Sequence, residues 1–171
     1  MRTMLDVIVQ SCTVELFRLW DLPVAPVRHM QVSVGQHRYE DLVGVVRFEA
    51  PRFSGALTLS LESSVLDGMI QVPTDARRRQ DWVREAANQL IGRLKNRLIN
   101  FQVTLHVGLP TAMSGRALEV KHRTFDTISV YLFRTVRGKL VVTLEGDIQP
   151  QALVYTGATL VPGEGEFIEF D

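Results

Sequence analysis

The sequence predicts an α+β fold in which long helices pack on an antiparallel sheet. Two segments repeat apolar residues every three or four positions, and several shorter segments have the apolar, β-branched character of strands. The order is helix, strands, helix, strands. This order indicates two pseudo-repeated halves, residues 1–72 and 73–147, each a helix followed by a β-meander.

The first half begins with a helix predicted over residues 3–20. After it, Pro26 indicates an extended or irregular segment. An antiparallel hairpin is predicted over 42–48 and 56–61, because two apolar runs flank a Pro- and Gly-containing turn. A short helix is expected over 64–70.

The second half begins with a helix whose N-cap is predicted at Thr74 or Asp75 and whose end is predicted near Phe101. A Gly-rich acidic tail at 162–171 closes the sequence, outside the predicted domain core. Gly138 is expected to be the turn between the last two strands. The strands predicted for this half are 102–109, 115–121, 126–135 and 139–147.

Composition excludes several classes of function. The 171 residues suit one domain, and the 19 basic and 19 acidic side chains cancel, which argues against a general binder of nucleic acid or anionic membrane. No apolar run approaches the roughly 20 residues of a membrane span. The single cysteine, Cys12, cannot form an internal disulfide, and we expect a cytoplasmic protein. Neither a His-Glu-x-x-His pattern nor a phosphate-binding glycine loop occurs, so no metal or nucleotide site is predicted.

The second predicted helix carries the candidate site. At about 100° per residue, Asp81, Glu85, Asn88 and Gly92 share an arc of about 60°. A polar helix face is usually just solvated, but asparagine and glycine are poor helix formers in mid-helix. A glycine one turn after the asparagine leaves a flat patch that another protein's backbone could approach closely. The opposite, core-facing side is predicted to hold Val83, Ala87, Leu90, Ile91, Leu94, Leu98 and Phe101.

The charge around this face is locally basic. Residues 75–97 hold seven basic and three acidic side chains. The run Arg77–Arg79 at the start of the helix has two interpretations, a solvated turn or a surface that steers an acidic partner.

The spacing on this helix resembles the signature of the CheC/CheX/FliY phosphatases. The matching positions are Asp81, Glu85 and Asn88, followed by Pro110. Gly92 fits the family's Asn-x-x-x-Gly pattern, and Leu109-Pro110 with Gly115 fits its Leu-Pro-x-x-x-x-Gly strand. These proteins act on phosphorylated CheY-like response regulators, and the resemblance covers most of residues 3–147.

The resemblance implies a role for each residue of the face. Asn88 would orient the water that attacks the aspartyl phosphate, and Glu85 would pair with the receiver domain's lysine. Asp81, Arg84 and Gly92 would bind the partner. The Mg²⁺ would belong to the receiver domain, so no cofactor is expected on this chain. A homodimer is also implied, and an exposed strand edge would suit one.

The first predicted helix tests whether there is a second site. Asp6, Gln10 and Thr13 repeat the spacing of Asp81, Glu85 and Asn88, but they lack the glutamate and the asparagine. One intact site per chain is similar to CheX rather than CheC. The alternatives are a non-catalytic module that binds a receiver domain or another signalling protein, and a structural component of a flagellar switch.

Overall fold

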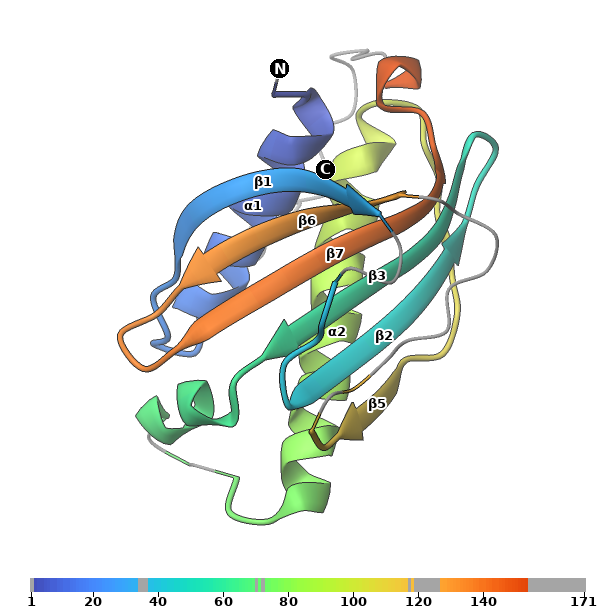
Figure 1. Ribbon diagram of the computed structural model, residues 1–171. Helices are drawn as coiled ribbons and strands as arrows, with labels where there is room; N and C mark the ends of the chain where they lie inside the picture. The colour runs from blue at the N-terminus through green and yellow to red at the C-terminus, as the bar shows by residue number, and fades with distance from the viewer. Residues whose placement is uncertain are drawn as a thin grey trace, which may run out of the picture.

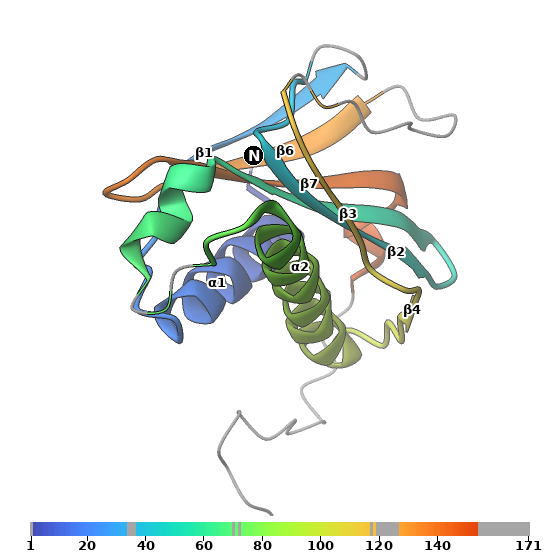
Figure 2. The same cartoon turned by 90° about the horizontal axis from the view of Figure 1, so that it is seen from below.

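Two helices cover one face of an antiparallel sheet in the computed structural model. Figure 1 shows the sheet in front of α1 (Met4–Arg18) and α2 (Ala76–Ile99), and the view from below in Figure 2 places both helices on the same side of it. Within the described part of the chain, no helix has the length and apolar character that crossing a membrane requires. The structure describes residues 2–33, 37–69, 71, 73–116, 118 and 127–153.

The described residues form one seven-stranded sheet in the order β1-β6-β7-β3-β2-β4, with β5 also paired to β2. Every pairing is antiparallel. The strands are β1 (Ala25–Ser33), β2 (Leu42–Glu49), β3 (Phe53–Leu61), β4 (His106–Val107), β5 (Thr111–Ser114), β6 (Thr127–Arg134) and β7 (Lys139–Ile148). Two 3₁₀ helices are η1 (Ser63–Gly68) and η2 (Pro150–Ala152).

The strand order is symmetric about its centre. The hairpins β2–β3 and β6–β7 lie side by side and are joined by the β3–β7 pair. Each half contributes strands to the other half's side of the sheet, because β1 pairs with β6, and both β4 and β5 pair with β2. The α+β prediction is therefore confirmed, with the refinement that the two halves share one sheet and one core. The boundary between residues 72 and 73 stays a prediction.

The elements of the first half follow the prediction closely. The helix and the β2–β3 hairpin are confirmed, and the short helix at 64–70 is the 3₁₀ helix η1. The segment that contains Pro26 is the strand β1, which agrees with the extended alternative, and its pairing with β6 changes register between Pro26 and Arg28. Its place at the edge of the sheet explains why proline is tolerated there, since an edge strand can lack one ladder donor.

The strands of the second half match the prediction only in part. The predicted 102–109 strand shortens to β4, and β5 at Thr111–Ser114 precedes the predicted 115–121 strand. Of that strand, Gly115, Arg116 and Leu118 lie outside any strand, and the other members lie outside the described residues. The predictions of β6, β7 and a turn at Gly138 are confirmed. The tail at 162–171 also lies outside the described residues.

Helix α1 is fixed at its start by reciprocal hydrogen bonds. The Thr3 hydroxyl accepts from the Asp6 amide, and the Asp6 carboxylate accepts from the Thr3 amide at 2.6 Å. The buried side of the helix includes Cys12, which is fully buried. Burial raises the pKa of this thiol to about 11, so it is a small core residue rather than a nucleophile.

Helix α2 lies against the sheet at a very short distance. Its N-cap is Asp75, whose carboxylate accepts from the Arg78 amide at 2.8 Å. A Cβ atom at Gly44 in β2 would come 2.5 Å from the Val83 carbonyl oxygen and 2.9 Å from the Ala87 Cβ. The helix therefore rests directly on the β2 backbone, which fixes its position relative to the sheet.

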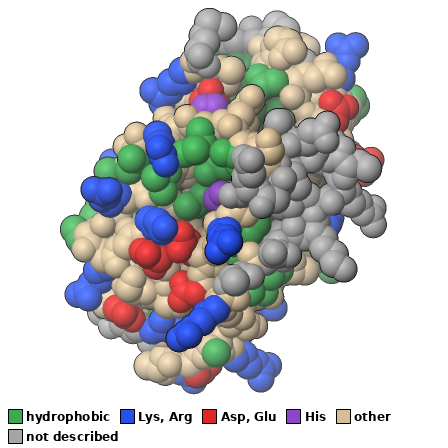
Figure 3. All heavy atoms as spheres, viewed as in Figure 1, with side chains coloured by type: hydrophobic (Ala, Val, Ile, Leu, Met, Phe, Trp, Pro, Cys, Tyr) green, Lys and Arg blue, Asp and Glu red, His purple; other side chains and the backbone are tan. Residues whose placement is uncertain are grey.

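The face of the sheet opposite the helices has its own apolar clusters. In Figure 3, which views this face, apolar side chains gather over β1, β6 and β7, with basic side chains among them. One cluster contains Ile128, Val130 and Val141, with Met30, Val32 and Leu132 packed against it. The candidate helix face points away from this side.

Asp6 connects α1 to the sheet and gives the stability a pH dependence. Its carboxylate accepts from the Tyr131 hydroxyl at 2.9 Å and lies 3.5 Å from the His29 imidazole. Burial alone would raise the pKa of Asp6. The hydrogen bonds from Thr3 and Tyr131, together with the charge of His29, outweigh burial and lower it. The unfolded chain then binds more protons than the native state, so stability is lost as the pH falls below about 4.

Replacing Tyr131 with phenylalanine is expected to weaken this pH dependence. The variant loses a hydrogen bond to a charged group, which costs about 2 kcal/mol at pH 7. Its Asp6 pKa moves back toward the ordinary value, so the stability gap to the parent narrows at pH 3.5. Urea unfolding at both pH values measures the gap. The control is Tyr39→Phe, which removes a buried hydroxyl that interacts with Thr143 and Thr58. An equal gap for Tyr131→Phe at the two pH values would contradict the assignment.

Candidate functional site

The outward face of α2 carries the predicted site residues together. The side chains of Asp81, Arg84 and Glu85 are exposed, and Asn88 and Gly92 are half-buried. The core-facing side buries six of the seven predicted residues within the helix, and Phe101 just beyond it. The periodicity of the sequence therefore separates the two faces correctly.

Glu85 and Asn88 differ in how they are held. The Glu85 carboxylate accepts a hydrogen bond from the side-chain Nε2 of Gln89 at 3.0 Å, one turn further along the helix. No residue in the described part of the chain donates to or accepts from the Asn88 carboxamide. A carboxamide both donates and accepts hydrogen bonds without carrying charge, so Asn88 is available to a bound partner or a water molecule.

Asp81 and Arg84 form an ion pair on the first part of the face. The Arg84 guanidinium donates to the Asp81 carboxylate at 2.9 Å, and each side chain is about half exposed. An exposed pair of this kind contributes little to stability. Two of the three predicted partner-binding residues, Asp81 and Arg84, thus lie near Glu85 and neutralise each other's charge.

Gly92 has no structural reason to be a glycine. A Cβ atom built at this position would meet nothing within 4 Å. Its backbone conformation is helical, and a glycine in a helix interior costs about 1 kcal/mol relative to alanine. The fold therefore carries a destabilising residue at a position on this face where a side chain would have open space.

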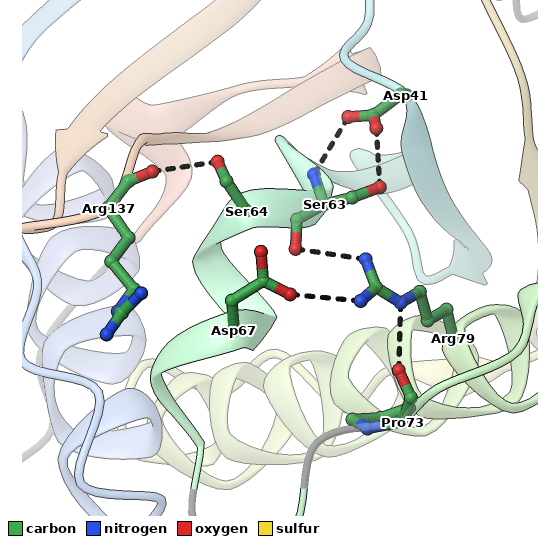
Figure 4. A network of polar contacts seen from close by, with 7 residues as sticks. All are labelled: Asp41, Ser63, Ser64, Asp67, Pro73, Arg79 and Arg137. Atoms are coloured by element: carbon green, nitrogen blue, oxygen red, sulfur yellow. Dashed lines mark hydrogen bonds and ion pairs between the residues drawn. The ribbon is translucent and has the colours of Figure 1, made fainter.

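Two of the three arginines at the start of α2 have partners within the chain. Figure 4 shows that the Arg79 guanidinium reaches toward η1 and donates to the Pro73 carbonyl at 2.8 Å, to the Ser63 carbonyl at 3.3 Å and to the Asp67 carboxylate at 3.0 Å. Arg78 pairs with Asp75. Arg79 is therefore a structural tie between η1 and α2, and the steering interpretation does not extend to it.

The prediction for the first helix uses the wrong register. Asp6 and Thr13 are buried, so they cannot occupy an exposed face like that of Glu85 and Asn88. Matching the buried positions of the two helices instead aligns Val7 with Glu85 and Gln10 with Asn88. The buried pairs behind this alignment are Leu5/Val83, Ile8/Ala86, Val9/Ala87, Cys12/Leu90, Thr13/Ile91 and Leu16/Leu94. The face of α1 still lacks both site side chains.

The described residues include no group of three or more His, Cys, Asp or Glu side chains arranged to hold a metal ion. Pro110 lies between β4 and β5 and is half-buried.

The close approach between Gly44 and α2, which sets the distance of the helix from the sheet, was not predicted from the sequence. An isolated glycine in a strand was the available signal.

The fold is similar to those of several solved structures. The chain aligns with a CheC-like superfamily protein from Shewanella sp. PV-4 at a TM-score of 0.73 and 17% sequence identity, over 85% of this chain and 100% of the other. A chain of the CheX–CheY–BeF3–Mg²⁺ complex from Borrelia burgdorferi aligns at a TM-score of 0.67 and 10% sequence identity, over 84% of this chain and 97% of the other. FliY from Thermotoga maritima aligns at a TM-score of 0.56 and 11% sequence identity, over 86% of this chain and 89% of the other. No family model matches the chain, and no curated protein matches it in sequence. The chain thus has the CheX/CheC-like fold.

Proposed function

We propose that this protein is a phosphatase that accelerates hydrolysis of the aspartyl phosphate on a CheY-like receiver domain. The observation that carries the proposal is the Asn88 carboxamide, which has no hydrogen-bonding partner in the described chain and lies between Glu85 and the bare backbone of Gly92. The fold supports it, since a CheX of the same fold forms a complex with CheY, BeF3 and Mg²⁺. Beryllofluoride is a tetrahedral mimic of a phosphoryl group.

The reaction requires only a few groups from the phosphatase itself. Water attacks the phosphorus in line, the bond to the aspartyl oxygen breaks, and the products are inorganic phosphate and a free carboxylate. The receiver domain supplies the Mg²⁺. Asn88 holds the attacking water by its amide oxygen and adds no negative charge beside the phosphoryl group. Glu85 pairs with the receiver's lysine, and Gly92 lets the partner approach the helix closely.

The direct test is a phosphatase assay against receiver domains from the same organism. Each domain is phosphorylated, and the loss of the aspartyl phosphate is followed with and without a substoichiometric amount of this protein. We expect turnover on at least one domain. If phosphoryl loss is unchanged but a complex forms, the alternative, a non-catalytic receiver-binding module, is correct.

Reversing the charge of Glu85 is expected to weaken the complex. Glu85→Lys places a like charge against the receiver's lysine, and we expect the dissociation constant to rise at least tenfold. Titration of a fluorescently labelled, beryllofluoride-activated receiver domain measures this change. The matched control is Asp147→Lys, which makes the same change of net charge at an exposed position on β7. Unchanged affinity in Glu85→Lys would remove this residue from the interface.

The homodimer, the cytoplasmic localisation and the flagellar-switch alternative remain predictions. A homodimer would find an uncovered sheet edge at β1, whose outer side has no strand partner among the described residues. Cytoplasmic localisation stays a prediction, and the phosphatase assay on receiver domains tests the flagellar-switch alternative. A switch component would bind its assembly partners without turning over an aspartyl phosphate.

A further inference from the structure

The edge of the sheet formed by β4 and β5, beside α2, contains a one-residue bulge between these two strands. Val107 of β4 lies opposite Phe48, and Thr111 of β5 lies opposite Val45. Three residues, 108–110, therefore face only two residues of β2. The Gly108 amide donates to the Arg47 carbonyl at 2.9 Å, which holds one side of the bulge in place. Bulges of this kind re-aim a side chain and are frequent next to active sites.

The bulge turns Leu109 out into solvent. This side chain is 90% exposed, whereas the next residue, Pro110, is half-buried. Proline has no amide hydrogen, so its place in the bulge leaves no unpaired donor. The leucine is thus presented from a short segment that is paired to β2 on both sides. The backbone that carries Leu109 is therefore held in place before binding, which reduces the conformational entropy lost on binding.

The register places Leu109 level with the candidate site. Ser114 at the end of β5 accepts a hydrogen bond from Gln80 at 2.6 Å, and Ala112 lies opposite Gly44, which lies under Val83 and Ala87. Residues earlier in β5 therefore lie beside residues later in α2. With rises of about 3.3 Å per strand residue and about 1.5 Å per helical residue, Leu109 reaches the level of the turn after Ala87. Figure 2 shows the β4 segment beside α2, on the side away from α1.

We infer that Leu109 is the apolar anchor of the receiver-docking surface, an inference that rests on the proposed function. The outward face of α2 is polar at Asp81, Arg84, Glu85 and Gln89, so it has little apolar area to bury against a partner. Interfaces concentrate their binding energy in a few well-buried anchors surrounded by polar contacts. The partner is a receiver domain with an apolar recess next to its phosphorylation pocket, so that one approach fills the recess and brings the phosphoryl group to Asn88.

The test compares Leu109→Glu with a matched control. Val136→Glu makes the same change at a valine that is 93% exposed in the β6–β7 turn, at a distance from the β4–β5 edge of the sheet. Both variants should keep the parent's circular dichroism spectrum and melting temperature, because neither side chain is packed. We expect Leu109→Glu to raise the dissociation constant for the beryllofluoride-activated receiver domain at least tenfold. It should raise KM by a similar factor and leave kcat unchanged. Val136→Glu should match the parent in both.

The outcomes separate this inference from the proposed function. If the parent binds and dephosphorylates a receiver domain and Leu109→Glu does so equally well, the anchor is wrong and the phosphatase assignment stands. If Leu109→Glu lowers kcat without raising KM, the residue is not a docking anchor. If the parent neither binds nor dephosphorylates any receiver domain of its organism, the proposed function fails and the anchor fails with it.

Discussion

Replacing Asn88 with alanine is expected to abolish phosphatase activity while making the protein slightly more stable. The carboxamide has no partner in the described chain, so its removal breaks no internal hydrogen bond. Alanine is the better helix former by about 0.5 kcal/mol, so the free energy of unfolding should rise by about that amount. Loss of a group that positions the attacking water should lower kcat by about 100-fold or more.

The measurement is the decay of the phosphorylated receiver domain under saturating conditions, together with urea unfolding. Asn96→Ala is the matched control, because it makes the same substitution at an exposed position on α2, two turns further along the helix and about 80° around its axis from Asn88. The control should gain similar stability and keep full activity. Binding of Asn88→Ala to the activated receiver should change little, since Glu85 and Leu109 are intact. Equal phosphoryl decay with Asn88→Ala and the parent would refute the assigned role.

The sequence predicts the buried and exposed faces of α2 better than it predicts the sheet, because the faces depend only on residues that are close together in the chain. The face of α2 depends on residues within four turns of each other, and helical periodicity resolves those positions without any knowledge of the sheet. Strand β1 depends on pairing with β6, about one hundred residues away in the chain, so no local pattern reveals it. Pro26 locally indicates either an extended or an irregular segment, and its place in an edge strand is what allows the extended form to join the sheet.

The register of the first helix could not be predicted for a different physical reason. Asp6 and Thr13 are polar, and polarity predicts exposure, yet both are buried. Their hydrogen bonds explain this: Tyr131 donates to Asp6, and the Thr13 hydroxyl donates to the Val9 carbonyl at 2.7 Å. The first bond again joins residues far apart in sequence. The exposure of Leu109 also depends on the registers of β4 and β5 against β2, which set the bulge.

Two glycine-to-alanine substitutions on opposite sides of α2 are expected to change stability in opposite directions. At Gly92 a Cβ atom meets nothing within 4 Å, so alanine should stabilise the protein by about 1 kcal/mol. At Gly44 a Cβ atom would come 2.5 Å from the Val83 carbonyl oxygen, which cannot rotate away because it belongs to the helix backbone. Either α2 or β2 must shift, and overpacking of this kind costs about 1–3 kcal/mol.

The two variants also separate docking from positioning. Gly92→Ala keeps α2 in place but adds a methyl group where the partner approaches, so KM should rise although the protein is more stable. Gly44→Ala displaces the turn between Val83 and Ala87, next to Glu85 and Asn88, so kcat should fall together with stability. Urea unfolding and a full KM and kcat determination on one phosphorylated receiver domain distinguish these patterns. A stabilised Gly92→Ala with unchanged KM would show that the receiver does not approach α2 at this glycine, and the helix cost at Gly92 would then have no explanation in docking.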